Sequence, residues 1–156
     1  MPERRVIMKV SKIHKITKAV VDVIFVLGII AVILVPLFVN WWSKLMKYSA
    51  EMTILLDIVL ILSGIVAVYV LWQVHIILRN VVQNKVFTDS TVTCLRKISI
   101  GTLLVSIIYF IKLFFNFGMG TLVISGSFLI ATLIFLTLKD VFKQANAIKK
   151  ENDWTI

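Results

Sequence analysis

The chain has 156 residues, of which 60% are hydrophobic; its mean hydropathy is +0.99 and its formal net charge is +9. Soluble domains are about 45–50% apolar, and no polar segment here is long enough to bury a core of its own, so we exclude a separate soluble domain. The single cysteine excludes an internal disulfide and paired-cysteine redox chemistry. We expect one integral membrane domain over residues 1–156.

The first part of the chain predicts a basic arm followed by a transmembrane helix. In residues 1–18, apolar residues recur at steps of three or four, which predicts a short amphipathic helix in the headgroup region. The apolar segment 19–40 is too long for a signal sequence and has no small-residue cleavage site after it, so we expect it to remain as the first transmembrane helix. Pro36 is expected to bend or end this helix near its outer end, and Trp41 and Trp42 follow where an aromatic belt belongs.

A second transmembrane helix is predicted over residues 54–79, followed by a cytoplasmic loop over residues 80–97. Within that loop, Thr88 is a suitable N-cap for a helix that begins at Asp89, because an acid is favourable in the first turn. We expect this helix to enter the membrane without a break.

The segment 98–138 has 41 residues and only one formal charge, Lys112. At ~1.5 Å per helical residue it is long enough to cross a core about 30 Å thick twice. A Gly-Met-Gly triplet at 118–120 divides it into predicted helices over 98–117 and 121–138, which the short turn requires to be antiparallel. Small and hydroxyl side chains on the two helices predict close approach and interhelical hydrogen bonds; they are Thr102, Ser106, Tyr109, Ser125, Ser127, Ala131 and Thr132.

The predicted fold class is therefore all-α: an integral membrane four-helix bundle made of two antiparallel hairpins. The basic residues set its orientation. Of the 17 Lys and Arg, six lie in residues 1–18, four in residues 79–97 and four in the tail, residues 139–156. These fourteen share one side of the membrane, so the positive-inside rule places that side and both termini in the cytoplasm, across a bacterial plasma membrane. The basic face is expected to attract anionic lipid headgroups, which explains the charge better than direct nucleic-acid contact does.

Asp57 and Lys112 are the most informative pair of charges in the predicted helices. Each lies about one turn inside the outer end of its helix, so their depths match. A charge at the centre of a spanning helix costs roughly 2.5–3.5 kcal/mol on insertion scales, and pairing reduces that cost. We hypothesise an intramembrane ion pair between them, with separate snorkelling to the outer headgroups as the alternative. A transport pathway is less favoured, because a carrier is expected to hold its acid near the midplane.

Two other reactive side chains have ordinary interpretations. His75 shares a helical face with Asp57 and Gly64 and is expected to cap or snorkel at the helix end, rather than to bind haem or sense pH. Cys94 is expected to be a packed thiol, with palmitoylation as the alternative. The sequence contains no P-loop, GxGxxG, CxxC or HExxH motif. We therefore expect no cofactor, no metal and no catalytic residues, in a protein that is not an enzyme.

Two segments resemble a family pattern. Residues 84–88 and 95–98 are similar to Gly-x-Pro-Phe-Ser followed by Leu-Arg-x-Ile, and residues 140–142 and 151–156 are similar to Glu-Val-Phe followed by Glu-Asn-Asp-Leu-Thr-Ile. Both patterns resemble an uncharacterised family of bacterial four-helix membrane proteins typified by YoaS. Members of that family look like companions of small helix-turn-helix transcription regulators. The resemblance implies a membrane protein that sequesters or signals to such a regulator.

The residues that could form the docking surface for this partner lie in the loop and the tail: Phe87, Arg96, Lys97, Asp153, Trp154 and Ile156. The main alternative is a small transport or immunity-type protein that acts within the bilayer, alone or as a homo-oligomer. An enzyme acting on lipid ranks third, since no cluster of polar groups at one depth is recognisable.

Overall fold

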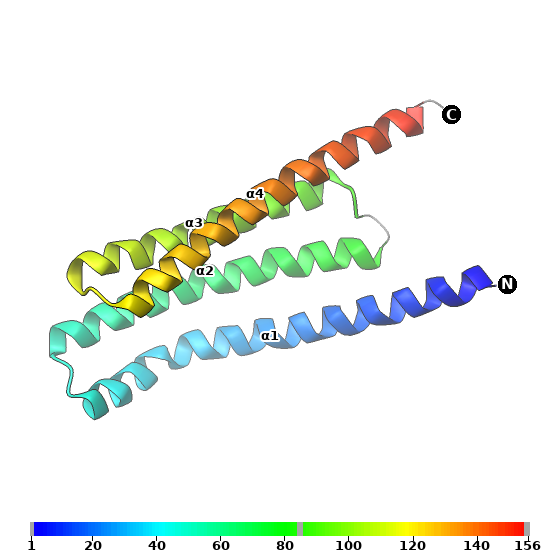
Figure 1. The fold of residues 1–156 in the computed structure, drawn as a ribbon. Helices are drawn as coiled ribbons and strands as arrows, with labels where there is room; N and C mark the ends of the chain where they lie inside the picture. The colour runs from blue at the N-terminus through cyan, green and yellow to red at the C-terminus, as the bar shows by residue number, and fades with distance from the viewer. Residues whose placement is uncertain (1, 84–85, 155–156) are drawn as a thin grey trace.

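The structure, a computed structural model, describes residues 2–83 and 86–154. These residues form four helices: α1 (Pro2–Met46), α2 (Ala50–Val82), α3 (Asp89–Phe115) and α4 (Met119–Trp154). All four are long and apolar enough to cross a membrane. In lipid every backbone polar group needs an internal partner, which a continuous helix supplies. The chain is thus a multi-pass membrane protein with the predicted all-α, four-helix bundle architecture (Figure 1).

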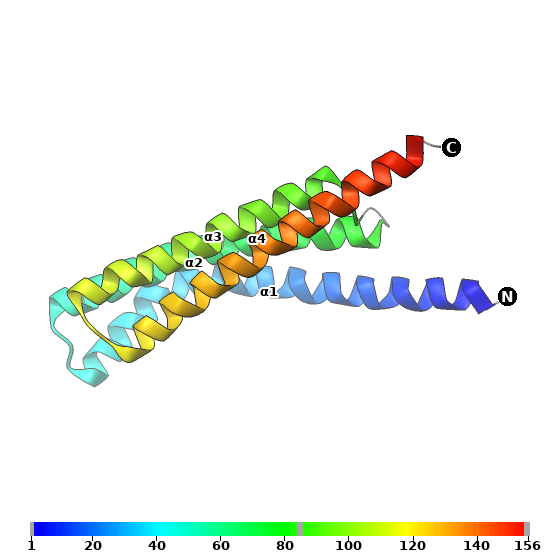
Figure 2. The same cartoon turned by 45° about the horizontal axis from the view of Figure 1, so that its top comes forward.

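The outer helices of the chain, α1 and α4, extend well beyond the predicted spans. With 45 and 36 residues, they measure about 67 and 54 Å at ~1.5 Å per residue, against a hydrocarbon core of about 30 Å. Both project past the α2–α3 link at the end of the molecule that holds the two termini (Figures 1 and 2). The basic arm is helical, but it continues α1 without a break, so the prediction of a separate helix is wrong. We call this end the cytoplasmic end, following the positive-inside rule.

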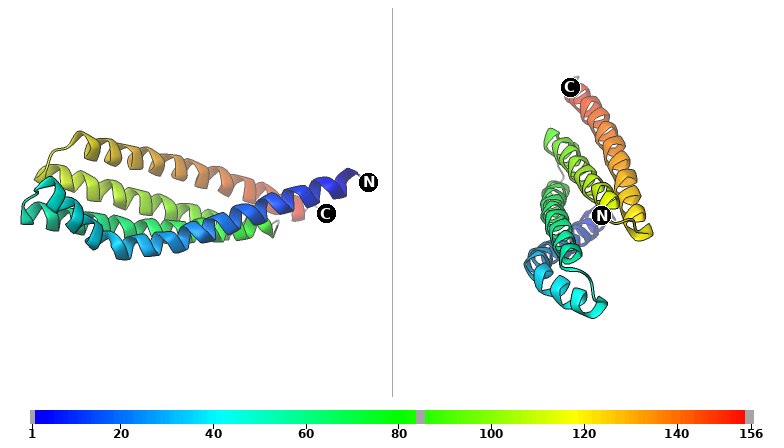
Figure 3. Two further views of the ribbon diagram at one scale, coloured as in Figure 1. Left: turned by 90° about the horizontal axis from the view of Figure 1, so that it is seen from below. Right: turned by 90° about the vertical axis from the view of Figure 1, so that its left-hand side faces the viewer.

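Pro36 does not end α1, which continues through it to Met46 and includes Trp41 and Trp42. Proline removes one backbone hydrogen bond and is tolerated in membrane helices where local adjustments satisfy the freed carbonyl. Figures 1 and 3 show α1 changing direction toward its outer end, as expected of a bend rather than a break.

The helix ends have identifiable capping residues. Lys47 follows α1 with a φ of 54°, the left-handed conformation that commonly terminates a helix. Ser49 caps α2 by accepting a hydrogen bond from the Met52 backbone N–H at 3.3 Å. Thr88 caps α3 in the same way, accepting from the Thr91 N–H at 3.4 Å. The predicted Thr88 cap and the helix beginning at Asp89 are confirmed.

The bundle is assembled in chain order. Among the described residues, α1 packs on α2, α2 on α3 and α3 on α4, and no other helix pair is in contact. The view along the helices in Figure 3 shows this arrangement as an open arc with α1 and α4 at its ends. Because α2 and α3 are flanked on both sides, the best buried side chains lie on α3, and Ile98 is 1% exposed.

The α3–α4 interface is joined by hydroxyl groups at membrane depth. The Thr102 and Thr132 hydroxyls lie 2.9 Å apart. Ser106 Oγ donates to the Ser125 carbonyl at 2.9 Å, and Ser125 Oγ donates to the Ser106 carbonyl at 3.0 Å. The predicted interhelical hydrogen bonds are confirmed for these four residues, which are all buried.

Glycines allow the other two interfaces to close. A Cβ added to Gly101 of α3 would lie 2.6 Å from Val70 Cγ2 of α2, and one added to Gly64 of α2 would lie 2.7 Å from Val32 Cγ2 of α1. Neither distance leaves room for a methyl group, so both helix pairs depend on glycine for their close approach.

Candidate functional site

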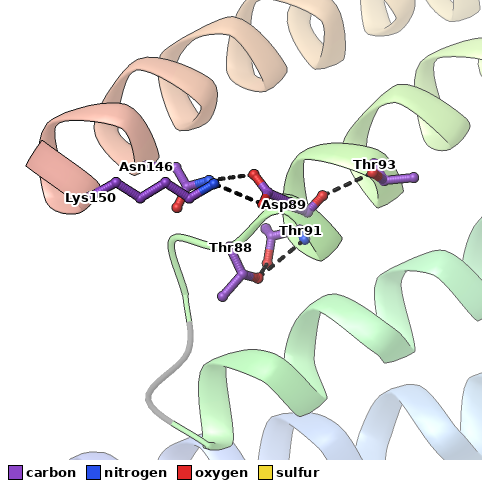
Figure 4. A network of polar contacts seen from close by, with 6 residues as sticks. All are labelled: Thr88, Asp89, Thr91, Thr93, Asn146 and Lys150. Atoms are coloured by element: carbon purple, nitrogen blue, oxygen red, sulfur yellow. Dashed lines mark hydrogen bonds and ion pairs between the residues drawn. The ribbon is translucent and has the colours of Figure 1, made fainter.

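The first turn of α3 and the last turns of α4 are joined at the cytoplasmic end by one carboxylate. Asp89 Oδ1 accepts a hydrogen bond from Asn146 Nδ2 at 2.7 Å, and Asp89 Oδ2 forms an ion pair with Lys150 Nζ at 2.9 Å (Figure 4). The Asp89 backbone carbonyl also accepts from the Thr93 hydroxyl at 2.8 Å. Thr88 caps the same turn. These contacts orient the part of α4 beyond the predicted span, residues 139–154, which we call the α4 extension, relative to the start of α3.

Lys150 lowers the pKa of the Asp89 carboxyl. Asp89 lies nine residues before Ile98, outside the predicted span, and its pKa is lowered from the usual 3.8, chiefly by the hydrogen bond and the positive charge of Lys150. Both side chains are largely exposed, at 78% and 57%. An exposed pair of this kind contributes little to stability, so it orients the tail more than it stabilises the fold.

The end of α2 is bound into the same region. Asn80 Nδ2 donates to the hydroxyls of Thr91 at 3.3 Å and Ser90 at 3.4 Å. From the link before α3, the Phe87 ring contacts Phe142 of α4, with ring centroids 5.4 Å apart and a 42° tilt. We call this set the cytoplasmic junction; its members are Asn80, Phe87, Asp89, Thr91, Phe142, Asn146 and Lys150.

The predicted partner surface coincides with the junction only in part. Phe87 belongs to it, and 42% of this residue stays exposed although its ring contacts α4. Arg96 and Lys97 are exposed, two turns further along α3. The backbones of Asp153 and Trp154 complete the last turn of α4; the prediction for Ile156 lies outside the described residues.

Asp57 and Lys112 do not form the predicted ion pair. Asp57 Oδ1 is buried without a hydrogen-bond partner, and none of the ion pairs among the described residues joins the two side chains. The reason is the face on which each residue lies. Asp57 shares a face of α2 with Gly64 and His75, and both of those residues contact α1, whereas Lys112 belongs to α3.

A different polar contact within this membrane region joins α1 to α2. His75 presents Nδ1 to Asp22 Oδ1 near the cytoplasmic end of the span. Trp72 stacks on the imidazole, with centroids 5.6 Å apart and a 12° interplanar angle, and its indole also contacts Phe25 at 5.6 Å. His75 was expected to cap or snorkel at its helix end, and the structure instead pairs it with a carboxylate of α1. The available signal was that Asp22 and His75 occupy matched depths on consecutive antiparallel helices.

Few described side chains are candidates for metal binding or for thiol chemistry. Within residues 2–83 and 86–154, no three His, Cys, Asp or Glu side chains gather in a group that could hold a metal ion. Cys94 is 4% exposed, as expected of a packed thiol.

Comparison with known proteins gives a family. The family model described as "Protein of unknown function (DUF2975)" matches residues 48–156, more than two thirds of the chain. The chain belongs to the DUF2975 family. This membership confirms the expectation of an uncharacterised family. The comparisons with curated proteins and with solved structures each gave no match.

The DUF2975 match divides the molecule unequally. It begins in the α1–α2 link and covers α2, α3 and α4, so every residue of the cytoplasmic junction lies within it. Asp57 and Lys112 lie within it as well. Asp22 and the rest of α1 lie before the matched range.

Proposed function

We propose that this protein is a non-enzymatic component of a bacterial plasma membrane that holds a small cytoplasmic helix-turn-helix regulator at the cytoplasmic junction. The junction is the observation on which the proposal rests. It connects three helices of the DUF2975 region through polar contacts and one aromatic contact, and it leaves Phe87 42% exposed on the side of the termini. A partly exposed aromatic side chain held in place by its neighbours is suited to anchor a protein contact.

The α4 extension supports the same interpretation. It carries the polar tail beyond the bilayer as a helix held at Asp89, so the tail has a defined direction relative to Phe87. A partner could therefore contact the loop and the tail together. The helix-turn-helix character of that partner follows from the family resemblance of the loop and tail motifs.

Affinity purification from native membranes tests this proposal. The protein carries an N-terminal tag so that the tail stays free, and recovered proteins are identified by mass spectrometry. We expect a small DNA-binding protein with the wild type, and its loss with Phe87→Ser or with deletion of residues 152–156. The matched control is Phe117→Ser, which changes an aromatic residue that is 70% exposed at the opposite membrane surface. The proposal would be contradicted if no DNA-binding protein is recovered with the wild type, or if Phe87→Ser recovers as much of it as the wild type does.

A second candidate function, transport or immunity within the bilayer, is favoured by buried polar atoms. Asp57 Oδ1 and Gln73 Oε1 are both buried at membrane depth without hydrogen-bond partners. Such groups are expensive in lipid and often mark ion or proton pathways. Proteoliposomes with an imposed potential test this candidate: proton uptake that Asp57→Asn abolishes would support it, and no uptake by the wild type would exclude it.

A further inference from the structure

A cavity of about 350 Å³ lies at the outer end of the bundle, where all four helices contribute. Its size falls in the range of small-ligand pockets, ~300–1,000 Å³. The groups in its wall that can donate hydrogen bonds are Trp42, Tyr48, Lys112, Asn116 and Thr121. The remaining wall consists mainly of apolar side chains of α1 and α2. A ligand that satisfies this wall needs an acceptor-rich anionic head and an apolar body.

Lys112 is the one charged residue in this cavity wall. It lies one turn before the end of α3 and is half-buried, and no carboxylate in the described part of the chain pairs with it. Asn116, in the same wall, donates its amide to the Met52 sulfur at 3.1 Å. Thioether sulfur is a weak acceptor, so this amide is readily available to a stronger one.

The depth of the cavity matches the lipid headgroups of the outer leaflet. Trp42 and Tyr48 are aromatic residues of the kind that gather at membrane interfaces, and Lys112 lines the same cavity as they do. A neighbouring cavity of about 530 Å³ shares Met52 and Asn116 with the first but is lined by Glu51. Its carboxylate repels an anion, so the Lys112 cavity is the one suited to an anionic head.

We propose that the Lys112 cavity binds an anionic phospholipid of the outer leaflet. The ammonium and the neighbouring donors hold the headgroup phosphate, and one acyl chain lies against the apolar wall. Charge-assisted hydrogen bonds to phosphate are the strongest contacts available at such a site. Free phosphate shares the head chemistry but has nothing to place against the apolar wall. This inference is independent of the proposed cytoplasmic partner.

The test measures lipid retention by native mass spectrometry, on full-length protein in detergent titrated with phosphatidylglycerol or phosphatidylcholine. We expect preference for phosphatidylglycerol, about tenfold loss of its affinity in Lys112→Gln, and retention of most of it in Lys112→Arg. The matched control is Lys44→Gln, because Lys44 is an exposed lysine at the same membrane surface that does not line the cavity. Millimolar inorganic phosphate is expected not to compete.

Equal affinity in Lys112→Gln and wild type would overturn the proposal, as would an equal loss in Lys44→Gln, which would indicate general surface charge. Competition by inorganic phosphate would also overturn it, in favour of a free-anion site. Far-UV circular dichroism shows whether each variant keeps its helical content, and binding by Lys112→Arg shows that the cavity tolerates substitution at this position.

Discussion

Gly101→Ala is expected to destabilise the α2–α3 interface. The added Cβ would lie 2.6 Å from Val70 Cγ2 and 3.5 Å from Val66 Cγ1. The second distance is an ordinary contact, but the first is about 1 Å too short for two carbon atoms at their optimal separation. Val70 cannot easily turn away, because valine in a helix has one strongly preferred χ1 rotamer. The helices must therefore separate or strain.

The magnitude follows from two opposing terms. An extra methyl in a packed interface costs typically ~1–3 kcal/mol. Alanine recovers part of that, roughly 0.5–1 kcal/mol, because it is a better helix former than glycine. We expect a net loss of about 1–2 kcal/mol in the free energy of unfolding, measured by reversible sodium dodecyl sulfate titration in mixed micelles with helicity as the signal.

Gly126→Ala is the matched control, because no heavy atom lies within 4 Å of a Cβ at that position. It is expected to leave stability unchanged or raise it by up to about 1 kcal/mol. Adding Val70→Ala to Gly101→Ala removes the clashing methyl, so the two changes should couple favourably. The steric reasoning is refuted if Gly101→Ala unfolds at the same detergent fraction as Gly126→Ala.

Three further outcomes are expected. Gly64→Ala should weaken α1–α2 packing through a 2.7 Å clash, seen as a lower midpoint in the same titration. A double-mutant cycle of Thr102→Val and Thr132→Val should give a coupling near ~0.6 kcal/mol and no more than ~1.7 kcal/mol; zero coupling would mean that their 2.9 Å contact adds nothing. The lowered pKa of Asp89 means that its contribution is complete above pH 3.8 and is lost as pH falls through the lower pKa of the folded state. Amide protection at the end of α4 should therefore differ between wild type and Asp89→Asn at pH 5–8 by a constant amount, and converge only below about pH 3.8.

Features that depend on local sequence were predictable. The lengths of the hydrophobic segments predict the four spans, because in lipid a continuous helix is the simplest structure that pairs every backbone N–H and C=O group. The N-cap at Thr88 follows from its hydroxyl and the acid after it. The hydroxyl contacts between Thr102 and Thr132 follow from the short turn, which forces α3 and α4 together.

Side-chain contacts between helices also depend on how each helix is rotated about its axis, so membrane depth alone did not predict them. Depth matches Asp57 with Lys112 and equally matches Asp22 with His75, but only the second pair faces across an interface. Helical periodicity places Asp57 and His75 on one face of α2, because they lie five turns apart. The sequence does not say that this face meets α1, so it could not decide between the two pairs. The junction contact of Asp89 with Lys150 depends on how far α4 continues beyond the bilayer, which hydropathy does not determine.

The chain-order packing of the bundle has a consequence for biogenesis. Among the described residues, each helix packs on helices that adjoin it along the polypeptide, so little loop entropy is lost in bringing partners together. Each hairpin can close as soon as its second helix enters the membrane, without waiting for a distant segment to be synthesised. Assembly from the ribosome can therefore proceed stepwise, and α4 completes the structure by docking on α3.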